Sequence, residues 1–301
     1  PSAGVPQAGV PTASATGALP AATPASGAAV TPTAAAPGAA AGEVTTITTD
    51  LVKAQFDSVG GNLVKLELLQ HVDSEDRKRN TLLFDRSAER VYAAQTGLIT
   101  AQPGVTLPNH YTPMKRVAGP DTMAAGANEL AVRFETAAPG GVTLAKTFTF
   151  KRGSYVVGVK HEIVNAGAAA VTPQLYLQLV RDGNPARGES KWYFTFTGPA
   201  VYTDAKRYEK IDFKDIEKGK TGHVTSATDG WIAMVQHYFA SAWLVGTAGP
   251  REFRTQKVSD NLYAVQMVLP LGELAPGASK AHEALLFAGP QEEHKLAALA
   301  P

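Results

Sequence analysis

Apolar and polar residues alternate along most of this chain, and this period of two restricts the fold more than any other feature. Val52, Ala54 and Phe56 alternate with polar neighbours, and a glycine-containing turn at 58–62 separates them from a second alternating stretch at 64–68. Strand side chains point to opposite faces in turn, whereas an amphipathic helix needs an apolar period near 3.6. No segment between the alternating stretches keeps a helical period over ten residues. The sequence therefore predicts a mainly β protein, an antiparallel sandwich of many strands without crossover helices.

Further alternating stretches are bounded by glycine, proline or asparagine. The stretch 230–246 is the most aromatic, and its two alternating runs flank Tyr238 and Phe239. Large aromatic residues at this spacing favour a tight hairpin whose rings pack across neighbouring strands. The other predicted strands lie at 130–134, 142–150, 155–159, 174–180, 261–269 and 280–287.

The first 42 residues contain no charged side chain and consist mainly of Ala, Pro, Gly, Ser and Thr. Frequent prolines disfavour helix, and few large side chains are available for burial. We therefore predict a disordered linker over 1–43 and a folded domain over 44–301. The sequence opens at Pro1 without Met or a leader, so we expect a fragment or a processed form.

A short α-helix is predicted at about 290–300. Pro290 suits a first helical position, and the two glutamates that follow suit the positive end of the helix dipole. Leu296 and Leu299 would share one face of this helix.

Charge and cysteine content exclude several classes of protein. The 28 basic residues almost balance the 27 acidic ones, giving a formal net charge of +1 and no overall field that would attract nucleic acid. Cysteine is absent, which excludes disulfides, thiolate nucleophiles and Cys-ligated zinc. No apolar run reaches the about 18 residues that a membrane-spanning helix requires. With a small, balanced charge and no coiled-coil pattern, a monomer is expected.

The histidines do not form a recognisable metal or catalytic motif. They are His71, His110, His161, His223, His237, His282 and His294. None has the spacing of paired zinc ligands, and no glycine-rich phosphate loop or nucleophile elbow occurs. We therefore assign no catalytic residue, no cofactor and no metal. His161 is in phase with an apolar strand and is interpreted as a core histidine rather than a general base.

His237 and Tyr238 mark the best candidate for a cleft. An enzyme acting there on a sugar would need a carboxylate opposite the histidine. Glu209 or Asp212 would be the partner in that hypothesis.

The stretch 202–220 places aromatic and aliphatic residues among charges of both signs. These residues are Tyr202, Tyr208, Ile211, Phe213 and Ile216. Two interpretations stay open: an edge strand whose charges prevent aggregation, or a surface that docks a partner or an extended segment.

Several of these stretches occur together, and in the same order, in one known family. The chain resembles the large periplasmic domain of the YidC family of Gram-negative inner-membrane insertases. The matching pieces are Gly60 and Gly61 in their turn, 146–159, 196–213, 230–243 and 289–301. The resemblance covers about 44–301 and is specific because the pieces occur in combination; the departures lie in loops.

The resemblance implies a β-supersandwich of the galactose-mutarotase-like type with a terminal helix packed on it. It implies that the linker follows a transmembrane helix of a multi-pass protein, with this domain on the periplasmic face of the inner membrane. The activity implied for the whole protein is insertion and folding of nascent membrane proteins, alone or with SecYEG and SecDF. The resemblance also implies that the insertase groove belongs to the membrane part, so no residue of this sequence is assigned to it.

Two hypotheses of function follow. The first is a non-catalytic accessory domain that contacts translocon subunits or substrate segments through the 202–216 region and through Leu296 and Leu299. The second is a carbohydrate-binding or mutarotase-like protein that uses a cleft at His237 and Tyr238. Such a cleft could also hold an extended polypeptide, as in a chaperone.

Overall fold

The computed structural model describes residues 29–32, 42–136, 141–186, 188 and 195–291. Two antiparallel sheets of nine strands each account for most of these residues. Sheet 1 contains, in spatial order, β1 (Val44–Thr48), β2 (Val52–Asp57), β3 (Asn62–Val72), β4 (Asn80–Arg86), β5 (Val91–Ile99), β10 (Gln174–Asp182), β17 (Leu262–Pro270), β16 (Arg251–Ser259) and β13 (Ser226–Ala227). Sheet 2 contains β12 (Arg207–Lys210), β11 (Gly198–Thr203), β14 (Trp231–Val235), β15 (Phe239–Leu244), β18 (Ser279–Pro290), β9 (Val156–Asn165), β8 (Val142–Lys151), β7 (Glu129–Thr136) and β6 (Met114–Arg116).

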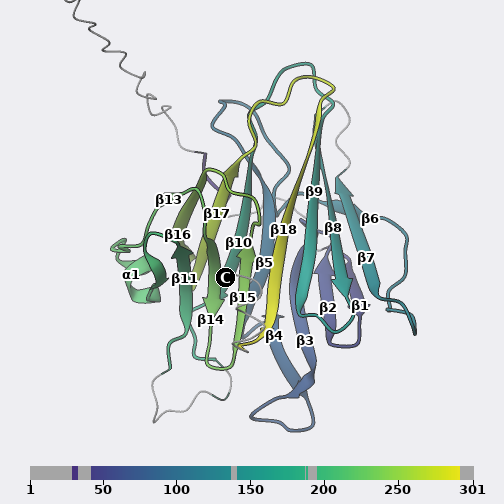
Figure 1. The fold of residues 1–301 in the computed structure, drawn as a ribbon, viewed down its shortest axis with the longest axis vertical. Helices are drawn as coiled ribbons and strands as arrows, with labels where there is room; N and C mark the ends of the chain where they lie inside the picture. The colour runs from purple at the N-terminus through teal and green to yellow at the C-terminus, as the bar shows by residue number, and fades with distance from the viewer. Residues whose placement is uncertain (1–28, 33–41, 137–140, 187, 189–194, 292–301) are drawn as a thin grey trace, which may run out of the picture.

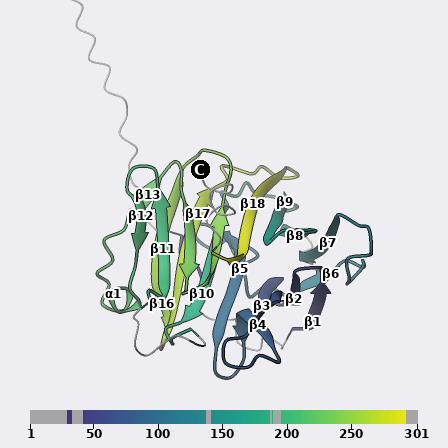
Figure 2. The ribbon, with the colours of Figure 1, turned by 60° about the horizontal axis from the view of Figure 1, so that its bottom comes forward.

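The two sheets form the layers of one sandwich. In Figure 1 the strands of the two sheets overlap along the line of sight, and in Figure 2 both sheets extend from α1 at one end to β1 and β6 at the other. Apolar side chains from both sheets fill the space between them, which confirms the predicted antiparallel sandwich. In one aromatic cluster, the ring of Phe56 on β2 lies 4.6 Å from that of Phe148 and 5.5 Å from that of Phe134.

The predicted hairpins are present with the expected turns. Strands β2 and β3 pair antiparallel across the turn at 58–62, where Gly60 and Gly61 both have positive φ angles. Strands β14 and β15 pair from Val235 opposite Ala240, so the aromatic stretch is a hairpin. Trp243 on β15 is buried and its Nε1 donates to the Gln178 carbonyl oxygen of β10 at 3.1 Å, which ties the two sheets together.

The 202–216 region differs from a single edge strand. It comprises β11, β12 and one short helix, α1 (Phe213–Glu217), which contains Phe213 and Ile216. The helix is too short for an apolar period to reveal it in the sequence. It packs its buried Ile216 inward beside β16, at one end of the sandwich (Figures 1 and 2).

The two ends of the described chain also differ from expectation. Pro290 is the last residue of strand β18 rather than the start of a helix, and the rest of the predicted helix, with Leu296 and Leu299, lies outside the described residues. Within the predicted linker, residues 29–32 pack against sheet 1, where Ala29 joins a small buried cluster. Among the described residues, no helix has the length and apolar character needed to cross a membrane.

Candidate functional site

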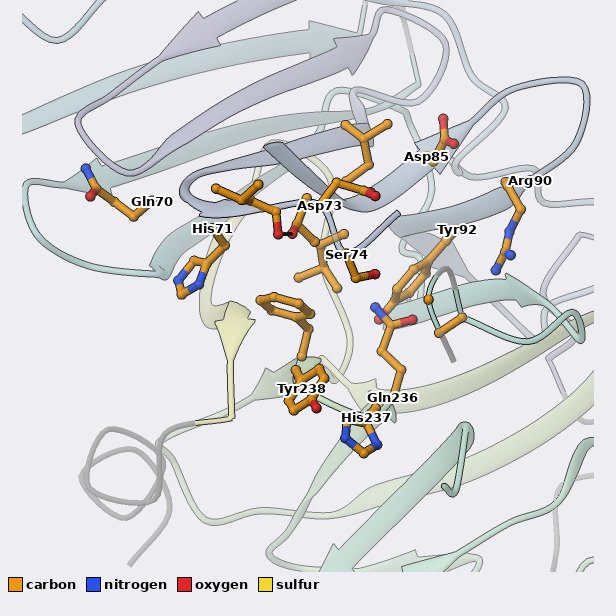
Figure 3. A pocket seen from close by; sticks show the side chains of 17 residues that line it. Gln70, His71, Asp73, Ser74, Asp85, Arg90, Tyr92, Gln236, His237 and Tyr238 are labelled. Atoms are coloured by element: carbon orange, nitrogen blue, oxygen red, sulfur yellow. Dashed lines mark hydrogen bonds between the residues drawn. The ribbon is translucent and has the colours of Figure 1, made fainter. Parts of the chain in front are cut away.

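A cavity of about 340 Å³ opens where the β14–β15 hairpin meets the far end of β3 and the loop after it. Figure 3 shows Gln236, His237 and Tyr238 approaching from the hairpin, with His71, Asp73 and Ser74 on the opposite side. Asp85, Arg90 and Tyr92 of β4, β5 and the loop between them complete the polar lining. The cavity therefore combines aromatic, acidic and basic groups.

The predicted cleft residues lie at this cavity. His237 and Tyr238 both line it, and Tyr238 is 68% exposed. His237 Nδ1 lies 2.6 Å from Thr195 Oγ1. His71, whose Nε2 is 3.1 Å from the Tyr155 hydroxyl, also lines the cavity and was missed, because β3 is far away in the sequence.

The pairing of His237 with Glu209 or Asp212 that the enzyme hypothesis named is not assembled at this cavity. Neither Glu209 nor Asp212 lines the cavity that contains His237. Glu209 instead accepts a hydrogen bond from the Val224 backbone N–H at 3.1 Å, and Asp212 precedes α1. The proposed pairing of His237 with either carboxylate is therefore wrong. In the described part of the chain, no group of three or more His, Cys, Asp or Glu side chains is placed to hold a metal ion.

The aromatic and aliphatic residues of the 202–216 region divide into an outer set and an inner, more buried set. Tyr202 stacks on Trp231 at 5.2 Å with the rings nearly parallel, and Tyr208 lies 6.0 Å from the same indole. Tyr208 is 42% exposed on β12, the outermost strand of sheet 2 in the described chain. Ile211 and Ile216 are buried. Phe213 is half-buried and stacks on Tyr263 at 4.9 Å.

A buried polar cluster lies between the two sheets. Lys146 is fully buried, and its ammonium donates to the carbonyl oxygens of Gly60 at 2.6 Å and Thr96 at 2.7 Å. Burial lowers the pKa of Lys146 to about 7 because the charged form loses its hydration. His161 Nε2 lies 3.0 Å from Thr96 Oγ1, and burial, followed by the charge of Lys146, lowers the pKa of His161 well below its usual value.

His161 is thus a core histidine, as its phase in β9 predicted. Lys146 was missed, although one signal was available. It occupies the same phase of β8 as Leu144, Phe148 and other buried apolar residues, so alternation alone places it in the core.

Comparison with known proteins identifies the family. The family described as YidC periplasmic domain matches residues 44–301. The chain belongs to this family. The membrane protein insertase YidC of Janthinobacterium sp. (strain Marseille) is 47% identical over 299 residues, covering 99% of this chain and 50% of that protein. The YidC of Cupriavidus necator is 49% identical over 292 residues, covering 96% and 51%.

This YidC periplasmic domain spans about half the length of the curated relatives it matches. Its fold is similar to that of a galactose mutarotase-like protein from Lactobacillus casei, with a TM-score of 0.50, 13% identity, and coverage of 82% of this chain and 100% of that one. A galactose mutarotase related enzyme from Lactobacillus acidophilus gives a TM-score of 0.52 at 10% identity, covering 82% and 97%. Likeness at this identity concerns the fold, which confirms the predicted galactose-mutarotase-like sandwich, and not the chemistry.

Proposed function

We propose that this YidC periplasmic domain is a non-catalytic accessory module of an inner-membrane insertase, and that it contacts subunits of the Sec translocon and its SecDF accessory. Nascent membrane proteins would be substrates of the full-length protein. Membership of the family supports the insertase context. The observation that carries the accessory role is the aromatic edge of sheet 2, defined as Tyr202, Tyr208, Lys210 and Trp231.

The aromatic edge has the properties of a docking surface. The exposed ring of Tyr208 is supported from below by the Tyr202–Trp231 stack, so its position is fixed before a partner arrives. Lys210 Nζ lies 6.0 Å from the centre of the Tyr208 ring and adds a positive charge beside it. Rigid aromatic groups with a neighbouring charge are common centres of protein interfaces. As an outermost strand, β12 can also accept an added strand from a partner.

The burial of each side chain in the 202–216 region indicates whether it can touch a partner or only support the surface. Since Ile211 and Ile216 are buried, we propose that Tyr202 and Tyr208 touch the partner, while Ile211, Phe213 and Ile216 hold α1 and β12 in place. Leu296 and Leu299 stay a proposed second contact.

A photo-crosslinking amino acid at Tyr208 of the full-length insertase is expected to form an adduct with a translocon subunit in cells. Val164 on β9 of the same sheet is a matched control, because it is 38% exposed and belongs to a different part of the surface. Tyr208→Ala is expected to weaken binding of the same subunit about fivefold, the typical effect of removing one interface aromatic. Equal adducts at both positions, or none from Tyr208, would contradict the proposed surface.

A further inference from the structure

A row of amide side chains crosses the outer face of sheet 1. Gln95 of β5, Gln178 of β10 and Gln266 of β17 lie directly opposite one another in adjacent strands. Gln266 Nε2 donates to Gln178 Oε1 at 2.6 Å, and Gln178 Nε2 donates to Gln95 Oε1 at 2.6 Å. Gln178 is only 2% exposed and Gln266 only 1%. Gln266 and Gln178 each donate an N–H to the side-chain oxygen of the next amide. The Oε1 of Gln266 is therefore the acceptor at the start of the row.

Residues 29–32 supply the donor for that acceptor. Thr31 Oγ1 donates to Gln266 Oε1 at 3.1 Å. Ala29 and Thr31 are buried, whereas Val30 between them is 72% exposed, so the segment lies extended on the sheet with alternate side chains inward. Ala29 belongs to a buried cluster with Ile99, Tyr176 and Val268.

Arg254 of β16 extends the row by one strand and holds the segment by its backbone. It lies opposite Gln266 in the β16–β17 pairing. The four strands that carry the row, β5, β10, β17 and β16, are consecutive neighbours in sheet 1 (Figure 1). Its Nη1 donates to the Ala29 carbonyl oxygen at 2.5 Å. Its Nε and Nη2 donate to Glu252 at 3.1 Å and 2.6 Å, which fixes the direction of the guanidinium. A contact with a backbone carbonyl is available to any peptide of suitable shape.

We propose that this row, Gln95, Gln178, Gln266 and Arg254, is a binding site for an extended peptide with a small apolar side chain followed two residues later by Ser or Thr. Residues 29–32 occupy the site as an intramolecular ligand, which a segment of the same chemistry supplied by another protein displaces. This site lies on sheet 1 and is independent of the aromatic edge.

Three features define the peptide that the site accepts. The Ile99, Tyr176 and Val268 cluster around Ala29 requires a small apolar residue. The acceptor of Gln266 requires a hydroxyl, because a buried amide oxygen without a donor is costly. The outward position of Val30 accepts any residue.

An intramolecular ligand weakens binding from solution, because the site is open only in the fraction of molecules whose own segment has left. If that fraction is about one tenth, the apparent dissociation constant rises about tenfold. Substitutions that dislodge the segment should therefore strengthen binding in trans.

The test uses the full chain and a fluorescein-labelled peptide with the sequence of residues 27–34, GAAVTPTA. Ala29→Arg places a long cation against the Ala29 cluster and should release the segment, while Val30→Arg adds the same charge at the exposed neighbouring position. We expect Ala29→Arg to bind the peptide about tenfold more tightly than Val30→Arg. The peptide GAAVVPTA, with Val in place of the threonine equivalent to Thr31, should bind Ala29→Arg about tenfold more weakly, because Gln266 then lacks its donor.

A second measurement does not depend on how well Ala29→Arg folds. Since the chain has no cysteine, Val30→Cys provides a single site for a nitroxide label that points to solvent. The label should show an immobilised spectrum at every protein concentration, and excess GAAVTPTA should convert it to a mobile one. Equal peptide binding by the two Arg variants, displacement by GAAVVPTA at the same concentration as by GAAVTPTA, or no displacement at all would overturn the proposal. Loss of immobilisation on dilution would do so too, because the occupant would then come from a second copy of the chain.

Discussion

Gly60→Ala is expected to lower the free energy of unfolding by about 3 kcal/mol or more, the range of strongly disruptive substitutions. Gly60 has a φ of +75°, which an L-residue adopts at a cost. A Cβ atom there would lie 2.2 Å from the His110 carbonyl oxygen and 2.5 Å from Asn62 Nδ2. Both groups are fixed, since Asn62 Nδ2 itself donates to the His110 oxygen at 2.7 Å. A backbone shift that relieved these close contacts would also move the Gly60 carbonyl oxygen, which accepts a hydrogen bond from Lys146.

Gly126→Ala separates the effect of backbone conformation from that of crowding. Gly126 has a φ of +81°, but a Cβ there would meet no atom within 4 Å. We expect Gly126→Ala to cost about 1 kcal/mol, the conformational part alone. Urea unfolding of both variants measures the difference, and equal losses would show that the turn at Gly60 moves to accept a side chain.

The free energy of unfolding is expected to rise by about 3 kcal/mol between pH 7 and pH 9.5 because of Lys146. The pKa of Lys146 is about 7 in the folded chain and its ordinary value is 10.5, so in this interval the unfolded chain binds more protons. The free energy of unfolding therefore increases as pH rises from about 7 toward 10.5. Below pH about 7 Lys146 is protonated in both the folded and the unfolded chain, so the full cost of burying its charge lowers the stability there. The buried histidines, whose pKa values are lowered, act mainly below this interval.

Lys146→Met should remove most of this pH dependence, since methionine has a similar length and no charge. Lys151→Met is the control, because Lys151 is an exposed residue of the same strand β8. Urea unfolding at pH 7 and 9.5 is the measurement. A Lys146→Met variant that kept the full rise of the parent would assign the effect to other groups.

Alternation predicted the strands and hairpins because burial on one face is a local pattern. The same rule placed His161 in the core. Applied to β8, it also predicts a buried Lys146, although a lysine is normally expected at the surface. It failed for the outer face of β10, where Gln178 looks like a surface residue but is buried in the amide row. What covers an outer face comes from distant parts of the chain, here residues 29–32, and no local period reports it.

The candidate sites show the same limit. Tyr238 and His237 were found because a hairpin tip is a local feature, whereas His71 and Asp73 reach the cavity from a distant strand. Ile211 and Ile216 looked like surface residues among charges, yet they are buried because the five-residue helix α1 turns the chain inward. A helix of this length carries too few residues to display a period.

Strand β18 has a mechanical consequence. It lies in the interior of sheet 2 between β15 and β9, and its last residue, Pro290, is opposite Phe239. Just beyond it, Gln291 donates its backbone N–H to the Tyr238 carbonyl oxygen at 2.9 Å. Tension applied at Gln291 therefore runs along a strand bonded on both sides and loads its ladders in shear, so many hydrogen bonds must break together. The domain would transmit such a pull as a rigid body, whereas the same pull on an outer strand such as β12 would open its bonds one at a time.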